Sequence, residues 1–400
     1  MPLENTKLVA WLGELLAEPV AAAKAREHTA FDAEVEAFRN RFVLFGAGNM
    51  GRRVLARLRQ DGVEPLAFAD NRQTLWGTSL DGLPVLSPEE AARWHGREAV
   101  VVVTIYNNEH SFPETRRELS ELGCAKVVSV VPLRWKYHET FLPYFRDDLP
   151  HKVLPQAALI RRAFGLWADE ASRREFVAQV AWRLNADFDV LAFPLLGQQY
   201  FPQGIFSLGD DAFFVDAGAY TGDTVQTFLA TRGNAFRGIL ALEPDPANYR
   251  SLCAYVESLP ASVRSRVEAR PLAVGGSAGR LRFNAGAGTS AGFDDVGSIE
   301  VECVRLDDLL QDRHPTYIKM DIEGAEPGAI EGCQHVLRED RPVLAACVYH
   351  AQDHLWTIPL AIHRLVPDYQ LFLRPHMPEC WETVCYAVPP KRLTMKSATL

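Results

Sequence analysis

The sequence lacks the features of a metal knuckle, a disulfide-stabilised domain or a membrane span. Its seven cysteines form no CxxC pair, so neither a zinc site nor a disulfide framework is indicated. No apolar run approaches the ~20 residues that cross a bilayer, and no basic segment followed by an apolar one marks a secretory signal. Several cysteines lie in apolar stretches, which is typical of buried free thiols in a reducing compartment. We therefore expect a cytoplasmic protein.

The charge of the chain argues against a nucleic-acid partner. Acidic residues outnumber basic ones by 51 to 42, which gives a net charge of −9, and long Lys/Arg runs are absent. Such a surface does not attract phosphate backbones. Hydrophobic residues make up 48% of the chain and charged residues 23%, a globular composition. A chain of 400 residues usually forms more than one domain. The sequence does not indicate an oligomeric state.

Short apolar strands alternate with helices along most of the chain. Apolar spacing predicts helices at 1–39, 52–60, 224–231, 246–259, 327–337 and 355–365. Apolar runs predict strands at 43–45, 65–70, 99–104, 126–131, 213–216, 238–243, 316–321, 343–349, 369–373 and 383–388. After residue 274 a β-like, glycine-rich stretch continues through Glu302. The last two strands follow each other without a helix, which predicts an antiparallel pair at a sheet edge.

This alternation implies parallel βαβ units, so we predict an α/β protein with two Rossmann-like domains. The expected segments are an N-terminal helical segment (1–39), a Rossmann-like nucleotide-binding-type domain (40–135), a helical connector (136–212) and a second α/β domain (213–400). The connector could also cover the cleft of the second domain. Within it, Tyr200 is expected either to contact cofactor or substrate or to pack at the domain junction.

The first glycine turn, Gly46, Gly48 and Gly51, has GxGxxG spacing between a strand and a helix. Glycines let the backbone approach a ligand, and a helix N-terminus offers amide donors to an anion. Asp70 ends the next strand and could bind a ribose diol. The turn therefore predicts a nucleotide site, or else a tight turn that has been retained without a ligand.

The second turn differs because a carboxylate ends the strand and another opens the helix. It comprises Asp216, Gly218, Ala219, Tyr220, Gly222, Asp223 and Thr224. Two acids oppose a pyrophosphate but suit the ammonium group of a methionine moiety. Glu243, at the end of the next strand with Asp245 behind it, can accept both hydroxyls of a ribose. The pattern predicts an S-adenosylmethionine site. The alternatives are a dinucleotide site, or acids that act only as helix caps.

Three acids follow the strand at 316–321, at the edge of an open α/β sheet where ligands bind. Asp321 and Glu323 lie two residues apart and are expected to project to one side. Glu326 either joins the site or caps the helix that begins with Pro327.

Histidines follow the next strands at the same edge. They are His350, with Asp353 and His354 close behind, and His376 after the strand at 369–373. Mixed Asp, Glu and His side chains could hold a divalent metal, although the sequence does not establish one.

The motifs around these residues resemble, in order, the FkbM family methyltransferases. The resemblance covers residues 200 to 390 and is most specific in the Lys-Met-Asp-Ile-Glu-Gly-Ala-Glu string at 319–326. It implies a class I methyltransferase fold and transfer of a methyl group from S-adenosylmethionine to a hydroxyl of a sugar, polyketide or related metabolite, as in bacterial polysaccharide biosynthesis. Many members carry an acid and a His after the fifth strand. Here His350 matches, but Tyr349 stands beside it and the acid is missing.

The N-terminal half resembles, more weakly, a small Rossmann-like domain that precedes some bacterial sugar-modifying acyltransferases. That resemblance rests on the glycine turn, Asp70 and a Gly-x-x-Leu-x-Gly-x-Pro-Val stretch at 77–85. It implies a nucleotide sugar as a partner of this half, or a role in docking a glycan.

The acceptor hydroxyl needs a base with a pKa near neutrality. His350 is the first choice because an ordinary imidazole has a pKa of ~6.5, with Asp321 or Glu323 orienting it, binding the acceptor or holding a metal. Glu326, His376 and Tyr200 are candidate substrate contacts. Two other functions remain open: an NAD(P)-dependent oxidoreductase of nucleotide sugars that uses the first turn, and a non-catalytic binding protein of glycan biosynthesis.

Overall fold

The computed structural model describes residues 2–283 and 299–394. The chain folds into two compact units. Unit 1 comprises Met1–Ala158, Val177–Phe193 and Met377–Trp381, and unit 2 comprises Leu159–Phe176, Pro194–His376 and Glu382–Leu400. The division into four segments that the sequence predicts is a different one, and it stays a prediction. No helix within the described ranges is long and apolar enough to cross a membrane.

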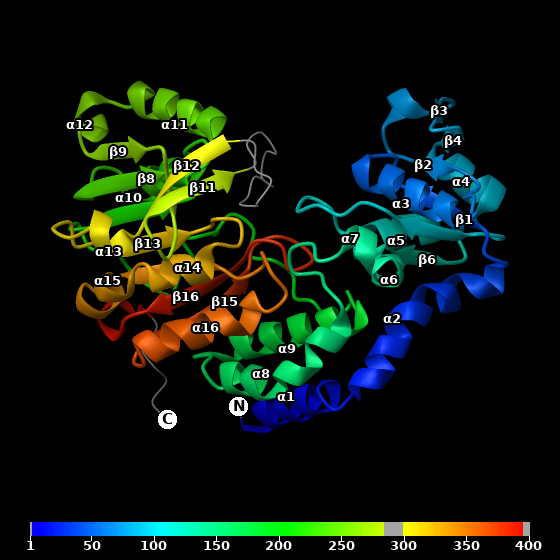
Figure 1. Ribbon diagram of the computed structural model, residues 1–400, viewed down its shortest axis with the longest axis horizontal. Coiled ribbons are helices and arrows are strands. Elements are labelled where there is room, and N and C mark those ends of the chain that lie inside the picture. The colour runs from blue at the N-terminus through cyan, green and yellow to red at the C-terminus, as the bar shows by residue number, and fades with distance from the viewer. Residues whose placement is uncertain (1, 284–298, 395–400) are drawn as a thin grey trace. The chain divides into compact units, whose positions relative to one another are not determined.

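Unit 1 is built on a six-stranded sheet in the order β3-β4-β2-β1-β5-β6 (Figure 1). Its strands are β1 (Phe42–Phe45), β2 (Phe68–Ala69), β3 (Ser79–Leu80), β4 (Leu83–Leu86), β5 (Val100–Val103) and β6 (Val127–Ser129). All pairs are parallel except β3 with β4. The central strands consist of buried apolar residues, as expected of a sheet covered on both faces.

Unit 1 also contains helices, and several of them contribute residues to the hydrophobic core around the sheet. They are α1 (Pro2–Leu15), α2 (Val20–Val35), α3 (Asn49–Gln60), α4 (Pro88–His95), α5 (Phe112–Glu121), α6 (Val131–Lys136) and α7 (His138–Phe141). The continuous helix expected over 1–39 is divided, because Pro19 lacks an amide hydrogen and stands as the N-cap of α2. Val54 and Leu58 of α3 pack with Phe42 and Phe68 of the sheet. Two further helices, α8 (Ala157–Phe164) and α9 (Glu170–Asn185), begin in one unit and end in the other.

Unit 2 contains a seven-stranded sheet in the order β15-β16-β14-β13-β7-β8-β9. The strands are β7 (Phe213–Ala217), β8 (Gly238–Leu242), β9 (Val267–Arg270), β13 (Tyr317–Met320), β14 (Val343–Cys347), β15 (Gln370–Pro375) and β16 (Thr383–Val388). The first five run parallel, whereas β16 is antiparallel to both β14 and β15. The antiparallel pair expected at the sheet edge is confirmed.

The helices of unit 2 follow the parallel strands in turn. They are α10 (Asp223–Arg232), α11 (Pro246–Ser258), α12 (Ala261–Arg264), α13 (Leu306–Leu309), α14 (Glu326–Glu331), α15 (Gln334–Glu339) and α16 (His354–Leu365). The single helix expected at 327–337 is divided at Gly332, where a Cβ would lie 2.1 Å from the carbonyl oxygen of Gly275. That close approach requires glycine.

A small second sheet pairs β10 (Leu272–Val274), β12 (Ile299–Val304) and β11 (Gly279–Phe283) in that order. It accounts for the ends of the glycine-rich stretch expected to be β-like, and residues 284–298 of that stretch lie outside the described residues. The carboxyl ends of β7, β8, β13 and β14 are neighbours in the large sheet, and that edge carries the residues described next.

Candidate functional site

The turn after β7 is held to the end of β13 by a buried lysine. Lys319 Nζ lies 3.1 Å from Asp216 Oδ1 and donates to the carbonyl oxygen of Gly218 at 2.5 Å. Burial opposes the charge of this ammonium, but Asp216 and Asp321 outweigh it and raise its pKa. Burial raises the pKa of Asp216 to about 6 while Lys319 lowers it. The charge of Asp216 is therefore balanced inside the protein.

Two glycines of this turn have positions that no side chain could share. Gly218 has a φ of +81°, and a Cβ there would lie 1.9 Å from the carbonyl oxygen of Asp321. Gly222 has a φ of +94°, and its Cβ would lie 2.8 Å from Cδ1 of Tyr255. Positive φ values favour glycine in any case. The backbone thus passes very close to the end of β13 before α10 begins.

Glu243, after β8, faces the same turn. Its Oε2 accepts from the backbone N–H of Tyr220 at 2.8 Å, and its Oε1 accepts from that of Asp245 at 2.8 Å. Burial raises the pKa of Glu243 to about 7, although these two N–H groups oppose the shift. A carboxylate oxygen has two acceptor positions, so each oxygen keeps one for a ligand.

Some of the remaining turn residues are buried and others are exposed to solvent. Ala219 and Thr224 are buried, while Asp223 is exposed as the first residue of α10. Asp245 caps α11, since its Oδ1 accepts from the N–H groups of Ala247 and Asn248 at 2.7 and 3.0 Å. Helix capping is one of the roles that the sequence allows for these acids, and Asp245 caps a helix in this structure.

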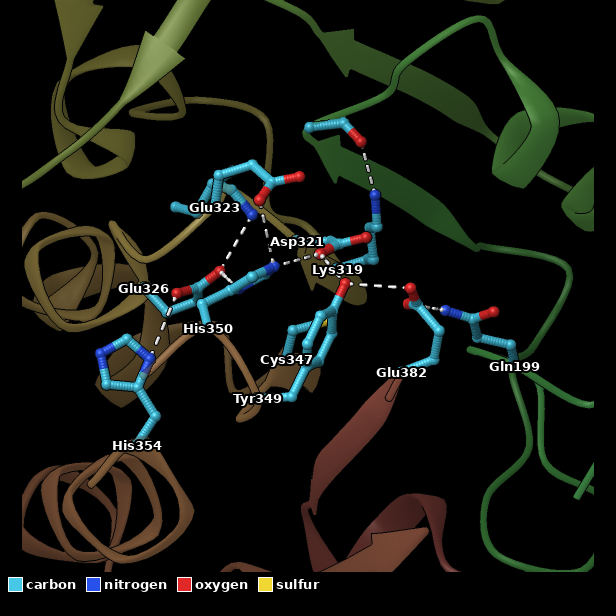
Figure 2. A network of polar contacts seen from close by, with 12 residues as sticks. Gln199, Lys319, Asp321, Glu323, Glu326, Cys347, Tyr349, His350, His354 and Glu382 are labelled. Carbon is cyan, nitrogen blue, oxygen red and sulfur yellow. Dashed lines mark hydrogen bonds and ion pairs between the residues drawn. The ribbon is translucent and has the colours of Figure 1, made fainter. Parts of the chain in front are cut away.

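His350 lies between acids that come from the end of β13 and the start of α14 (Figure 2). Its Nδ1 is 2.7 Å from Glu326 Oε1. Its Nε2 is 3.3 Å from Asp321 Oδ1 and 3.7 Å from Glu323 Oε2. Glu326 Oε1 also accepts from the N–H of Ile322 at 2.9 Å. The buried Glu326 therefore holds the imidazole, which presents Nε2 to the other two acids.

These contacts shift the pKa values of the histidine and of Glu323. Burial opposes a charged imidazole, but Glu326, Asp321 and Glu323 together raise the pKa of His350 to about 10. Burial, reinforced by Asp321 and Glu326, raises the pKa of Glu323 to about 8. The choice of His350 as base assumes an ordinary imidazole pKa, whereas this raised pKa favours a protonated ring at neutral pH. The role of His350 as base stays a prediction.

Tyr200 joins the same group of residues from outside the sheet. It has a φ of +64°, and its backbone is fixed by two phenols: Tyr386 accepts from its N–H at 2.9 Å and Tyr317 donates to its carbonyl oxygen. Its own hydroxyl donates to Asp321 Oδ2 at 2.8 Å. These bonds tie Tyr200 to the site residues, and its contact with cofactor or substrate stays a prediction.

His376 supports this arrangement through Tyr386. Its Nε2 lies 2.8 Å from the hydroxyl of Tyr386, and its Nδ1 lies 3.0 Å from the carbonyl oxygen of Leu195. Burial lowers the pKa of His376 to about 4, so the ring is neutral and Nδ1 carries the hydrogen donated to Leu195. Both ring nitrogens are therefore engaged inside the protein. His354 lies nearer the acids, with Nδ1 3.6 Å from Glu326 Oε2.

Four residues of the network were not singled out from the sequence. The Tyr349 hydroxyl lies 3.1 Å from Glu382 Oε1 and 3.3 Å from Asp321 Oδ1. Gln199 Nε2 donates to Glu382 Oε2 at 2.7 Å, and Cys347 Sγ lies 3.5 Å from the Tyr200 hydroxyl. No local motif marks Glu382. The register of β14 with β16, Cys347 opposite Val384, places Glu382 beside Tyr349 when it is continued by two residues.

Two trios of these side chains bring potential ligand atoms within 4.8 Å of one another. They are Asp321 with Glu326 and His350, and Asp321 with Cys347 and Glu382. In the first trio, His350 and Glu326 form an ion pair, so the negative charge of Glu326 is already balanced without a metal ion. A divalent metal stays a prediction.

In unit 1 the glycine turn is tight, and its acid is fully engaged. A Cβ at Gly51 would lie 2.0 Å from the carbonyl oxygen of Gly46, whose φ is +109°. Asp70 Oδ2 accepts from the N–H of Ala47 at 2.8 Å and from Arg72 Nη2 at 3.0 Å, and its Oδ1 accepts from Arg72 N and Nε, each at 2.9 Å. A carboxylate has about four acceptor positions, so none is left here for a ribose.

Comparison with solved structures identifies a shared fold. The chain superimposes on the crystal structure of methyltransferase FkbM from Methylobacillus flagellatus KT with a TM-score of 0.75 and 24% identity, covering 97% of this chain and 100% of that one. It also matches UDP-D-quinovosamine 4-dehydrogenase from Vibrio fischeri at a TM-score of 0.19, 22% identity and coverage of 22% and 75%, which is too low to carry an argument. No curated protein matches the chain.

The family comparison covers the sheet edge described above. Residues 216–373 match the family model of the methyltransferase FkbM domain. The matched range begins at Asp216 and includes Glu243, Asp321, Glu323 and His350. The mixed α/β fold with its antiparallel strand pair agrees with the FkbM structure as well. Residues 216–373 of unit 2 therefore match the methyltransferase FkbM domain, and the chain shares the fold of the FkbM structure.

Proposed function

We propose that unit 2 uses S-adenosylmethionine to methylate a hydroxyl group. The observation that carries the proposal is the carboxylate of Glu243, which two backbone N–H groups hold at the end of β8 beside the glycine turn. Each oxygen keeps one acceptor position, and the two together suit the paired hydroxyls of a ribose. Glu243 is 6% exposed, so such bonds would form largely out of water.

The turn itself fits the rest of this cofactor. Gly218 and Gly222 let the turn pack closely against Asp321 and Tyr255, which fixes the path of the backbone beside Glu243. Asp216 is neutralised by Lys319, so its part is to fix the turn. Asp223 is the exposed acid at the start of α10, and we assign it to the ammonium group of the methionine moiety.

The bound cofactor supplies a methyl group on a positively charged sulfur, which is already a good leaving group. The protein must then align the acceptor, exclude water and remove a proton. Asp321, Glu323 and Glu382 offer acceptors to a polyhydroxylated molecule. The hydroxyls of Tyr200 and Tyr349 donate to Asp321 and Glu382 and so orient these carboxylates. This composition favours a sugar, a glycan precursor or a related metabolite as acceptor.

We assign the removal of the proton to Glu323. Its side chain is 24% exposed, whereas that of His350 is 1% exposed. Its pKa of about 8 leaves roughly a tenth of the molecules ionised at neutral pH, within the range useful for general base catalysis. His350, protonated and held by Glu326, stabilises the ionised form of Glu323 across 3.7 Å.

Ligand binding tests the cofactor assignment and separates it from the dinucleotide alternative. S-adenosylhomocysteine should raise the melting temperature of the full chain, and NADH should not. Glu243→Gln should abolish the shift, whereas Glu257→Gln, on the exposed surface of α11, should preserve it. Stabilisation by NADH that Glu243→Gln removes would show that the site takes a dinucleotide. Transfer of a labelled methyl group to sugars or glycan precursors would exclude a non-catalytic binding protein.

A further inference from the structure

A cavity of about 780 Å³ in unit 1 has a strongly basic lining. Arg52, Arg53, Arg59 and Arg72 line it, and Asp81 is the one carboxylate among its lining residues. The chain as a whole carries a net charge of −9. Three of these arginines are paired with carboxylates, Arg52 with Asp81, Arg59 with Glu64 and Arg72 with Asp70. An anion that enters the cavity must compete with these carboxylates.

The cavity extends along one face of α3, a helix of 12 residues. Gly48 and Asn49, at its start, also line the cavity, and no side chain caps this end. Its first amides and the positive end of the helix dipole are thus available to an anion. Arg52 and Arg59 are seven residues apart and share a face, about 10 Å from each other along the axis. A ligand with more than one anionic group fits this length.

In this structure the carboxylate of Asp81 forms an ion pair with Arg52. Asp81, in the turn between β3 and β4, accepts from Arg52 Nε at 2.7 Å and from Nη2 at 3.2 Å. This two-point arrangement is the one that phosphate oxygens adopt with a guanidinium. Arg59 Nη1 donates to the carbonyl oxygen of Asp81 at 2.7 Å, and its Nε and Nη2 donate to Glu64 at 2.9 and 2.6 Å. Arg53 Nη2 donates to the carbonyl oxygen of Thr140 at 3.1 Å.

We propose that this cavity binds a molecule through a diphosphate group. Asp70 has no acceptor left for a ribose, as described above, so recognition falls to the arginines and the start of α3. Asp81 acts as an internal competitor for Arg52, which a diphosphate displaces. The residues of this site all belong to unit 1, and the proposal does not depend on the function proposed for unit 2.

The experiment titrates the full-length chain with inorganic pyrophosphate, inorganic phosphate and UDP by calorimetry at low ionic strength. Pyrophosphate should bind at least tenfold more tightly than phosphate, because one phosphate cannot reach both ends of the arginine row. Arg52→Gln should weaken pyrophosphate binding tenfold or more. Asp81→Asn should strengthen it several-fold. Opposite effects from the two partners of one ion pair cannot arise from loss of that pair alone.

Arg57→Gln is the matched control, since Arg57 lies on α3, carries the same charge and bonds Asp61 outside the cavity. It should leave the affinity within twofold. The proposal is overturned if pyrophosphate and UDP both fail to bind at millimolar concentration, if Arg57→Gln weakens binding as much as Arg52→Gln, or if Asp81→Asn weakens it. Tighter binding of UDP than of pyrophosphate identifies a nucleotide as the source of the diphosphate, and equal binding identifies the diphosphate alone.

Discussion

The phenol of Tyr349 lies 3.1 Å from the carboxylate of Glu382, although 33 residues separate the two in the chain. FkbM-like sequences often place an acid next to the histidine after the fifth strand, and this chain has Tyr349 there. The antiparallel register of β14 with β16 brings a carboxylate to the same place from another strand. Glu382 therefore brings a carboxylate to the hydroxyl of Tyr349, the residue next to His350.

Removal of the Tyr349 hydroxyl should lower turnover about tenfold without changing cofactor affinity. The hydroxyl lies between Asp321 and Glu382, and a hydrogen bond to a charged group contributes roughly 1.5–3 kcal/mol. Steady-state kinetics of Tyr349→Phe would measure this. Tyr369→Phe is the control, because Tyr369 donates to the carbonyl oxygen of Pro342 and its loss should affect stability alone. Equal turnover in both variants would remove Tyr349 from the site.

Glu323→Gln should reduce turnover by about a hundredfold or more, the usual contribution of a general base. In the wild-type protein, turnover should rise with pH around an apparent pKa of about 8, because the ionised carboxylate accepts the proton. The pH dependence of kcat with saturating cofactor would measure it. A midpoint near 10, the pKa of His350, that Glu323→Gln leaves unchanged would return the base role to His350.

The buried pair of His350 and Glu326 should contribute to stability over a defined pH range. The pKa of His350 is raised above ~6.5 in the unfolded chain, so its contribution is complete below that value and is lost as pH rises through about 10. The pKa of Glu326 is lowered, so its contribution is present above ~4.3 and is lost as pH falls through the folded value. Between these limits the pair is intact.

Glu326→Gln should therefore lower the free energy of unfolding by ~3 kcal/mol at pH 7, as for other broken buried pairs, and by less above pH 10. Urea denaturation at both pH values would test this. The exposed pair of His314 with Asp340 gives the control, and Asp340→Asn should change stability by less than ~1 kcal/mol. A loss for Glu326→Gln that is the same at both pH values would contradict the assigned charge of His350.

Gly218→Ala should abolish binding of S-adenosylhomocysteine. A Cβ would lie 1.9 Å from the carbonyl oxygen of Asp321, so the turn or the end of β13 must move. Gly233→Ala is matched to it, since Gly233 also has a positive φ, +57°, but an added Cβ meets no atom within 4 Å. That variant should lose about 1 kcal/mol of stability and keep its affinity. Calorimetric titration and thermal melting distinguish the two effects.

Much of the fold could be predicted because strands buried on both faces are continuous apolar runs. Residues 343–347, for example, are all buried in β14. The clustering of Asp321, Glu323 and His350 followed from the rule that parallel strands end at one edge. Local patterns could not reveal β9, whose residues are only partly buried, or the contact of Tyr349 with Glu382, which depends on register. Local sequence patterns could not predict the pKa of His350 either, because three acids raise it and they lie near the imidazole only in the folded chain.

The charge of Lys319 links the binding of a positive ligand to the protonation of the nearby carboxyl groups. Its ammonium contacts both Asp216 and the carbonyl of Gly218, and it also lowers the pKa of Asp321. A positive ligand that settles beside Gly218 adds to the same electrostatic potential and so makes the nearby carboxyl groups release protons more readily. Linkage is reciprocal, so deprotonation of those carboxyl groups must strengthen binding of the positive ligand. The equilibrium affinity for the methyl donor should therefore increase with pH, independently of the rate of methyl transfer.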